Sequence, residues 1–326
     1  MVHSQRFDVL SADERSRLDA STMPDWIDPM KAMLTEERFS SDEWLYERKL
    51  DGIRCLAFRQ GSNVRLLSRN KLELNGRFPQ VASAVQGATD ADCVLDGEVV
   101  AFAGGTTSFE KLQQRGERRV SIYYYVFDLL YLDGYDVRQL GTRSRKRLLV
   151  DAVRLKGPLR STPHRNRDGE TYYAEACRRG WEGLIAKRAD APYGGGRSRD
   201  WLKFKCSAEQ ELVIGGFTAP RGSRTDLGAL LLGYFEDGRL RYAGKVGTGF
   251  TEQTLHELAA ALAPLARPSS PFADEIRERT ITWVEPRLVA QVGFTEWTRD
   301  GRLRHPRFLG LRDDKPAREV VRERAR

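Results

Sequence analysis

The stretch Lys49-Leu50-Asp51-Gly52-Ile53-Arg54 decides how this chain is interpreted. It ends a segment, residues 44–49, in which apolar and polar residues alternate as they do in a strand. A lysine in this position can attack a phosphate once neighbouring cations or desolvation lower its pKa from the ordinary value of about 10.4. The first four residues of the stretch, Lys49-Leu50-Asp51-Gly52, are of common types that recur by chance, so the stretch has meaning only together with later parts of the chain.

Five further motifs follow in order, and they hold the charged and aromatic groups that such an attack requires. They are Ser68-Arg69-Asn70, Leu95-Asp96-Gly97-Glu98-Val99-Val100, Tyr125-Val126-Phe127-Asp128-Leu129-Leu130, Glu182-Gly183-Leu184-Ile185-Ala186-Lys187 and Trp201-Leu202-Lys203-Phe204-Lys205. Carboxylates in the second and fourth suit a hard divalent cation that bridges phosphates. The phenyl ring in the third can stack on a purine base. The two lysines of the last share one face of a strand, where a polyphosphate would relieve their repulsion.

Each motif alone has an ordinary structural interpretation. Arg69 fits a solvated turn, Glu98 a hairpin, Phe127 a core position, and Lys203 and Lys205 an exposed edge strand. The functional interpretation therefore depends on their common order and spacing.

Length and composition set broad limits. The 326 residues predict two domains, and the net charge of +8, from 54 basic and 46 acidic residues, permits a polyanionic partner or simply a well-solvated surface. The four cysteines and four histidines are scattered, so neither a zinc cluster nor a disulfide framework is predicted, and a reducing cytoplasm is expected. No apolar run approaches membrane-spanning length, and the N-terminus has no signal-peptide pattern.

The pattern of predicted strands and helices changes near residues 206–209. Before this point, strands are predicted over residues 44–49, 53–59, 63–68, 122–130, 183–188 and 201–205, a strand pair over 93–103, and helices over 12–20, 78–85, 109–115, 142–156 and 171–179. After it, short strands are interrupted by one helix at 251–263. This pattern suits an OB-fold barrel, and a β-sandwich fits nearly as well.

The six motifs together resemble those of the covalent nucleotidyltransferases, the superfamily of polynucleotide ligases and capping enzymes. Within it the chain is similar to bacterial ATP-dependent DNA ligases, and more narrowly to the ligase domain of ligase D. The stretches that carry this resemblance are residues 44–56, 66–70, 240–250 and 304–315. It implies an α+β fold: an antiparallel-sheet adenylation domain with an N-terminal extension over residues 1–206, then an OB-fold domain over 207–326, with residues 207–210 as the hinge.

The resemblance also implies roles for individual residues. Lys49 matches the nucleophile that takes AMP from ATP. Matching positions around the nucleotide are Glu47 at the adenine edge, Phe127 stacked on the base, Arg54, Arg69 and Glu98 near the ribose and phosphate, and Lys203 and Lys205 at the α-phosphate. Glu98 and Glu182 match the carboxylates that hold Mg²⁺ or Mn²⁺. Arg304, Arg312 and Lys315 match the last motif, which closes over the pyrophosphate.

The same resemblance implies the biological setting. The expected substrate is duplex DNA with nicks or ends, sealed in repair or end joining by a monomer in the bacterial cytoplasm, at the nucleoid, with no membrane and with a Ku-like end-binding protein as a partner. The basic helix that contains Arg143, Arg145, Lys146 and Arg147 can be a DNA-binding surface or a solvated helix face.

Two alternative functions remain open. An RNA ligase or a capping-type guanylyltransferase shares the lysine chemistry, and preferential labelling by GTP would favour it. A non-catalytic DNA-end binding scaffold would have lost a nucleophile or a phosphate ligand. Lys49, Glu98, Glu182, Lys203 and Lys205 are all present, which argues against the scaffold.

Overall fold

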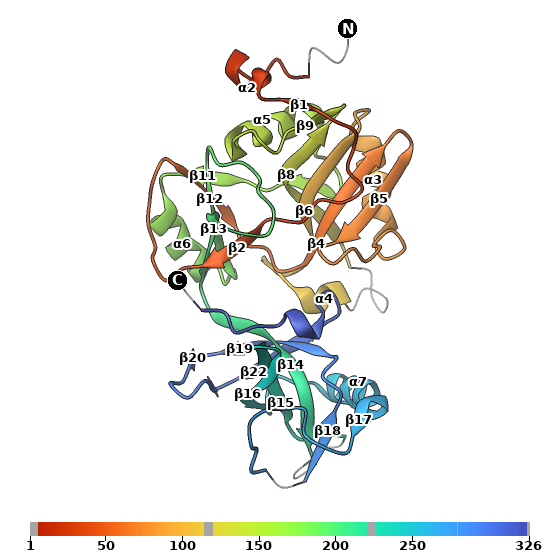
Figure 1. Cartoon of the computed structure of the whole chain (residues 1–326), viewed down its shortest axis with the longest axis vertical. Helices are drawn as coiled ribbons and strands as arrows, with labels where there is room; N and C mark the ends of the chain where they lie inside the picture. The colour runs from red at the N-terminus through yellow and green to blue at the C-terminus, as the bar shows by residue number, and fades with distance from the viewer. Residues whose placement is uncertain (1–5, 114–119, 221–225, 279, 325–326) are drawn as a thin grey trace. The chain divides into compact units, whose positions relative to one another are not determined.

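The computed structural model describes residues 6–113, 120–220, 226–278 and 280–324 (Figure 1). They form two compact units, one up to Cys206 and one from Ser207 to Arg324, and each unit has a hydrophobic core of its own. No helix in these ranges has both the length and the apolar character needed to cross a membrane.

The first unit is built mainly from strands. They are β1 (Asp19–Ala20), β2 (Lys31–Leu34), β3 (Trp44–Arg48), β4 (Ile53–Gln60), β5 (Asn63–Ser68), β6 (Cys93–Ala103), β7 (Thr106–Thr107), β8 (Ile122–Leu132), β9 (Tyr135–Asp136), β10 (Leu159–Ser161), β11 (His164–Asn166), β12 (Gly183–Arg188) and β13 (Arg197–Lys205). The helices are α2 (Ala12–Ser16), α3 (Pro79–Ala88), α4 (Phe109–Gln113), α5 (Thr142–Ala152) and α6 (Gly169–Arg178).

Two sheets position the motifs. One has the order β1-β9-β8-β6-β4-β5, with β10 added to β8 and β7 to β6, and the other has the order β11-β3-β12-β13-β2. All pairings in them are antiparallel except β10 with β8 and β13 with β2. The central strand β8 is almost wholly buried, as its run of aromatic and β-branched residues predicts. The nucleophile motif leaves β3 in the smaller sheet and enters β4 in the larger one.

Local signals placed most of these elements well. Ser11 caps α2 in a capping box with Glu14, and Gly61 turns the β4–β5 hairpin with a positive φ of 55°. The predicted strand pair over residues 93–103 is wrong: β6 is one long strand, because both its edges are paired, with β4 and with β8. The last two residues predicted for the helix at 109–115 lie outside the described ranges.

The second unit is a strand-rich fold with one longer helix. Its elements are β14 (Ala208–Thr218), β15 (Leu230–Glu236), β16 (Arg239–Val246), α7 (Glu252–Leu262), η2 (Ala263–Leu265), β17 (Ala266–Arg267), β18 (Ile281–Val284), β19 (Val289–Phe294), β20 (Glu296–Trp297), β21 (Leu303–Arg304), β22 (Arg307–Arg312) and η3 (Ala317–Glu319). The main sheet has the order β16-β15-β14-β18-β17, and β19 pairs with both β14 and β22. The long strand β14 thus pairs with three other strands.

The absence of a disulfide, expected from the scattered cysteines, is wrong. Cys177 near the end of α6 is bonded to Cys206, which directly follows β13. The two residues are 29 positions apart in the chain, and only the packing of α6 beside the end of β13 brings them together. Cys55 and Cys93 are free and buried.

The hinge predicted at residues 207–210 lies mostly inside a strand. Three of its four residues, Ala208, Glu209 and Gln210, already belong to β14 and are paired with β19. Strand β13 ends at Lys205, so only Cys206 and Ser207 separate the two strands.

Candidate active site

Lys49 lies directly after β3, with its side chain only 19 % exposed. Its backbone N–H donates a hydrogen bond to the carbonyl oxygen of Gly183 (2.9 Å), and its ammonium forms an ion pair with the carboxylate of Glu182. Gly183 has a φ of +141°, and a Cβ there would collide with the carbonyl oxygen of Phe204. The glycine therefore lets the Glu182 turn approach the neighbouring strand closely enough to place the carboxylate on Lys49.

Two opposing effects act on the Lys49 amine. Burial lowers the pKa of Lys49, but the Glu182 carboxylate, with smaller contributions from Asp51 and Glu98, raises it above the ordinary value overall. Lys49 is therefore an ammonium held by Glu182 in this structure. Any change that withdraws Glu182 removes the largest effect that opposes burial, and so shifts Lys49 toward the neutral amine, which is the nucleophilic form.

Glu47 is held between two lysines. Its side chain is 2 % exposed, and its carboxylate oxygens lie 2.6 Å from Nζ of Lys146 on α5 and 2.9 Å from Nζ of Lys187 on β12. Burial lowers the pKa of Lys187 to about 8, although Glu47 opposes this shift. The buried cluster contains one carboxylate and two ammonium groups. Its net charge is therefore positive, and it can attract a further hydrogen-bond acceptor.

Phe127 on β8 is buried beside two cations. The guanidinium carbon of Arg54 lies 4.6 Å from its ring centroid, and Nζ of Lys187 lies 4.2 Å away. Trp201 on β13 meets the same ring edge to face, with centroids 6.0 Å apart. The ring predicted to stack on a base is therefore buried among two cations and Trp201, and Lys187 connects it to Glu47.

Arg54 has a definite structural partner. It binds the fully buried carboxylate of Asp96 through two hydrogen bonds of 2.5 Å, and Asp96 also accepts one from the hydroxyl of Tyr193 (2.6 Å). Burial lowers the pKa of Arg54, but Asp96 raises it above its ordinary value overall. Arg54 is therefore a fixed cation beside Phe127.

The carboxylates of Glu98 and Glu182 both lie close enough to Lys49 to influence its pKa. Glu98 lies opposite Arg54 in the ladder of β4 and β6. Within the described part of the chain, no group of three or more acidic, histidine or cysteine side chains could hold a metal ion by itself. Two carboxylates suit Mg²⁺ when phosphate oxygens and water complete the shell, so the donor set fits an ion that arrives with a nucleotide.

The strand registers bring the remaining predicted residues of the first unit to the same two sheets. Glu47, Ile185 and Lys203 lie side by side across β3, β12 and β13. Lys205 follows two residues later on β13 and lies on the same face as Lys203. Arg69 lies in the turn after β5.

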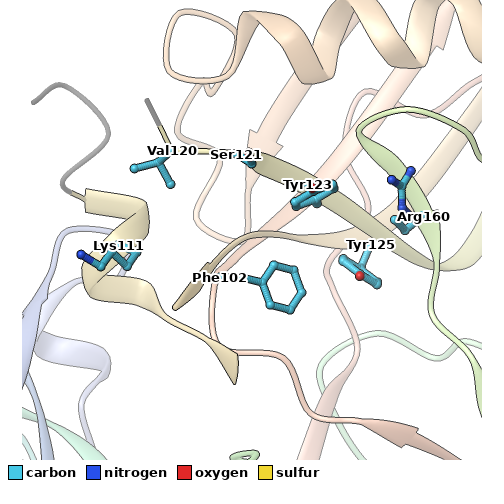
Figure 2. A pocket seen from close by; sticks show the side chains of 7 residues that line it. All are labelled: Phe102, Lys111, Val120, Ser121, Tyr123, Tyr125 and Arg160. Atoms are coloured by element: carbon cyan, nitrogen blue, oxygen red, sulfur yellow. The ribbon is translucent and has the colours of Figure 1, made fainter. Parts of the chain in front are cut away.

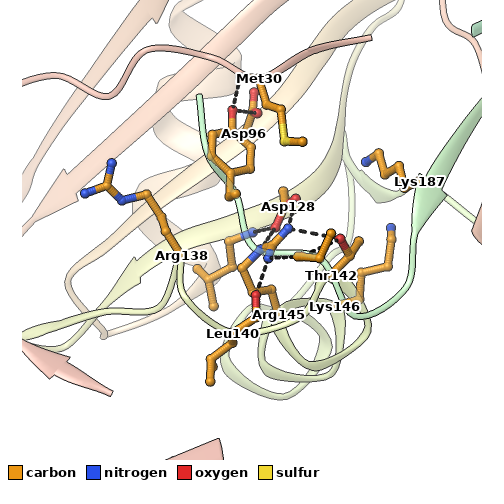
Figure 3. A network of polar contacts seen from close by, with 12 residues as sticks. Met30, Asp96, Asp128, Arg138, Leu140, Thr142, Arg145, Lys146 and Lys187 are labelled. Carbon is orange, nitrogen blue, oxygen red and sulfur yellow. Dashed lines mark hydrogen bonds and ion pairs between the residues drawn. The ribbon is translucent and has the colours of Figure 1, made fainter. Parts of the chain in front are cut away.

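Two of the four cations of the basic helix are buried, so the helix is not a wholly solvated face. Arg145 is fully buried and binds Asp128 through two hydrogen bonds of 2.7 and 3.0 Å, and it also donates to Leu140 and Thr142 (Figure 3). Lys146 is buried against Glu47. Of the four cations, Arg145 and Lys146 hold β8 and β3 instead of facing solvent.

The residues that sequence reasoning left without a role in the site are Lys146, Lys187, Trp201 and Asp96. Lys187 could have been found, because it lies one residue before the end of a strand in which it alternates with Gly183 and Ile185 on one face. Lys146 could not, because its partner Glu47 lies 99 positions away in the numbering of the chain.

Comparison with known proteins places this geometry in a family. Residues 28–205 match the model of the ATP dependent DNA ligase domain, and residues 223–315 match that of the ATP dependent DNA ligase C terminal region. The chain belongs to the ATP-dependent DNA ligase family.

Two relatives show which members of this ligase family the chain is similar to. The chain is 42 % identical over 313 residues to the multifunctional non-homologous end joining protein LigD of Pseudomonas aeruginosa, covering 93 % of this chain and 37 % of that protein. It is 41 % identical over 290 residues to the LigD protein of Mycobacterium tuberculosis, covering 87 % and 38 %. The ligase chain thus spans less than two fifths of the length of these relatives.

A solved structure of mycobacterial DNA ligase D complexed with ATP and MES is also similar. The TM-score is 0.68 at 38 % identity, over 91 % of this ligase and 98 % of that chain. The fold is therefore a nucleotidyltransferase domain followed by an OB-fold domain. This decides between the barrel and the sandwich, which the strand pattern alone left open.

The three cations of the last ligase motif lie in the second unit. Arg304 is paired with Glu296 (2.6 Å), Arg312 with Asp314 (2.8 Å) and Lys315 with Glu211 (3.2 Å). Arg304 is exposed, whereas Arg312 and Lys315 are mostly buried. Arg312 and Lys315 are thus held in place by carboxylates of their own unit.

Proposed function

We propose that this protein seals breaks in duplex DNA through a lysyl-AMP at Lys49. The observation that carries the proposal is the position of the Lys49 ammonium. It is buried on Glu182, in the unit that also holds Phe127 between cations and the lysine pair of β13. A buried lysine with a removable carboxylate partner is suited to covalent catalysis, because loss of that partner yields a neutral amine in a desolvated site.

The first step exchanges one bond at phosphorus for another. Neutral Lys49 attacks the α-phosphorus of ATP, the N–P bond forms, and the bond to the bridging oxygen breaks as pyrophosphate leaves. Lys203 and Lys205 offset the negative charge that develops on the phosphate oxygens. Glu98 and Glu182 would hold Mg²⁺ or Mn²⁺, which supplies further charge neutralisation when bound. The AMP then passes to a DNA 5′-phosphate, and the adjacent 3′-hydroxyl displaces it as the strands join.

Glu47 and Lys187 are proposed to read the purine. An adenine offers a donor at N6 and an acceptor at N1, which complement an acceptor carboxylate and a donor ammonium. A guanine offers an acceptor at O6 and a donor at N1, so both contacts would be repulsive. Buried polar groups left unpaired discriminate strongly between substrates. This pair supports ATP over GTP, and so a ligase over a guanylyltransferase.

The setting of the reaction is part of the same proposal. The net charge of +8 suits a polyanionic duplex, and the LigD relatives are described as end-joining proteins. We infer that nicks or ends of duplex DNA are the substrate, that the protein acts as a monomer in the bacterial cytoplasm at the nucleoid, and that a Ku-like protein brings it to DNA ends.

Intact mass after incubation with ATP and Mg²⁺ tests the first step. The wild-type protein is expected to gain one AMP, and Lys49→Ala none. Pyrophosphate is added first to strip any adenylate already present. Nicked duplex DNA is then supplied to the adenylated protein, and loss of the adduct together with a joined strand is expected. Neither gain nor loss of AMP by the wild type would overturn the proposal in favour of a scaffold.

A further inference from the structure

A cleft of about 630 Å³ lies in the first unit, apart from the residues assigned above to the Lys49 site (Figure 2). Its volume is within the range of roughly 300–1,000 Å³ that is usual for sites of small molecules. The lining residues are Phe102, Lys111, Val120, Ser121, Tyr123, Tyr125 and Arg160. Three aromatic rings and two cations therefore meet in one hollow.

The cleft continues the sheet face that carries the catalytic carboxylate. Tyr125 on β8 lies directly opposite Glu98 on β6 in the strand ladder, and such opposed side chains are on the same face. Phe102 lies four residues after Glu98 on β6, and Tyr123 lies two residues before Tyr125 on β8, so both remain on that face. A DNA strand that passes over Glu98 can therefore reach the cleft along the same face of the sheet.

The rings are arranged to receive another ring. Phe102 meets Tyr123 at 5.8 Å and an interplanar angle of 76°, and meets Tyr125 at 6.1 Å and 59°. All three side chains are partly exposed. Arg160 lies over the ring of Tyr123 and Arg48 over that of Phe102, but the three rings stay partly exposed, so a flat aromatic group from outside can stack on the ring surface that these contacts leave open.

The cations suit a phosphate beside that flat group. The guanidinium carbon of Arg160 lies 5.2 Å from the centroid of Tyr123, and Lys111 lies on the other side of the cleft, on α4 (Figure 2). Among the described residues that line the cleft there is no carboxylate. An aromatic group that carries a negative charge is the ligand that this lining complements.

We propose that the cleft binds an unpaired nucleotide of the DNA strand that enters the ligase site, with its base on Phe102, Tyr123 and Tyr125 and its phosphate near Arg160 and Lys111. The proposal rests on the proposed function. The base is unpaired because the faces of paired bases inside a duplex are covered by their neighbours, whereas an unpaired base can stack on protein rings. The cleft thereby holds a single-stranded extension or a mismatched end during joining.

The test compares two DNA duplexes that differ only at one end. One is blunt, and the other has a short single-stranded extension whose first base is the fluorescent analogue 2-aminopurine. Affinity is measured by fluorescence anisotropy, and stacking by quenching of the 2-aminopurine. The proteins are the wild type, Tyr123→Ala, Tyr123→Phe and Arg160→Ala, with Arg154→Ala as a matched loss of an exposed arginine elsewhere in the first unit.

The wild type is expected to bind the extended duplex more tightly than the blunt one and to quench the fluorescent base. Tyr123→Ala should weaken binding of the extended duplex by roughly tenfold, as for the loss of one stacked base, and leave the blunt duplex unchanged. Arg160→Ala should weaken only the extended duplex. Tyr123→Phe, which keeps the ring, and Arg154→Ala should both behave as wild type.

Three results would overturn the cleft proposal: equal affinity of the wild type for both duplexes, equal weakening of both by Tyr123→Ala, or reversal of the quenching by free AMP as effectively as by a single-stranded oligonucleotide. The last would identify a site for free nucleotide instead.

AMP transfer from ATP, measured without DNA, checks that each variant is folded. If Tyr123→Ala fails that check, Arg160→Ala decides. Failure of the wild type to seal a fully paired nick would count against the proposed function, whereas intact sealing without preference for the extension counts only against the cleft.

Discussion

At the scale of residues, the proposed function assigns the choice of nucleotide to single side chains. In that proposal Glu47 accepts a hydrogen bond from the base, which an exposed carboxylate could not do reliably because it can turn toward water. Its two lysine partners prevent this, and they differ in position: Lys187 also lies on the face of Phe127, whereas Lys146 approaches from α5. Lys187 is therefore expected to contact the base, and Lys146 to position Glu47.

Replacing Lys187 by methionine tests this difference. The variant should lower kcat/KM for AMP transfer from ATP by roughly ten- to a hundredfold, since a hydrogen bond from a charged donor is lost. Its effect on GTP should be small or favourable, so the ratio of ATP to GTP labelling falls. Lys146→Met is the matched variant and should change this ratio less. An ATP to GTP ratio that is unchanged in Lys187→Met would contradict the assignment.

The ATP preference should also depend on pH. The pKa of Lys187 is about 8, lowered by burial and by Lys146 and raised by Glu47 and Asp128. Below this pH the ammonium repels the N1–H of guanine, and above it the neutral amine can accept that hydrogen. The labelling ratio of ATP to GTP is therefore expected to fall as pH rises through about 8. Using the ratio cancels the pH dependence of Lys49, and the Lys187→Met variant should show no such change.

At the scale of elements, helix α5 is attached to the sheet by charge. Burial raises the pKa of Asp128, but Arg145 lowers it below the ordinary value overall, so the carboxylate is ionised at 0 % exposure. Asp128 lies next to Phe127 on β8, and Lys146 lies next to Arg145 on α5. The same helix thus holds the strand of the stacking ring and the carboxylate of Glu47.

Arg145→Ala should destabilise the first unit by about 3–5 kcal/mol, because it leaves Asp128 charged and unpaired in the core. Arg147 lies on the same helix as Arg145, but it is exposed and pairs with Glu14 of α2. Arg147→Ala should therefore cost less than about 1 kcal/mol. Both values come from urea unfolding followed by circular dichroism. Similar costs for the two variants would show that Arg145 is no more important to the fold than a surface arginine.

The disulfide between α6 and the end of β13 should stabilise the first unit. It closes a loop with a sequence separation of 29 residues, for which chain entropy gives about 3.5 kcal/mol. Adding a reductant should lower the urea midpoint of the wild type and leave that of Cys206→Ser unchanged. Thiol titration of protein unfolded without reductant should find two of the four cysteines reactive, and four reactive thiols would contradict the bond.

At the scale of the whole molecule, we expect net charge to contribute to the encounter with DNA. The chain carries +8 overall, and phosphate contacts release counterions from the duplex. Affinity for a blunt duplex is expected to fall by about tenfold or more between 50 and 200 mM salt. Anisotropy titrations at several salt concentrations measure the slope. A flat response would mean that few phosphates are contacted and that the charge mainly serves solubility.

The sequence by itself determined much of this protein. Alternation of apolar and polar residues, the buried run of β8 and the turn at Gly61 are local signals, and they predicted the strands because a strand's pleat is set by its own residues. The six motifs, together with the stretches at residues 240–250 and 304–315, were sufficient to predict the ligase family, and the OB-fold domain followed from that resemblance. These features need no knowledge of what lies opposite each side chain.

Only the tertiary structure decided which charges are buried and what they bind. Arg145 and Lys146 look like a solvated helix face in the sequence, yet Asp128 and Glu47 hold them in the core. Cys177 and Cys206 look unrelated until α6 packs beside β13. The reason is the same in each case. Ion pairs and disulfides depend on where two distant segments come into contact, and the periodicity of one segment does not show which distant segment it will contact.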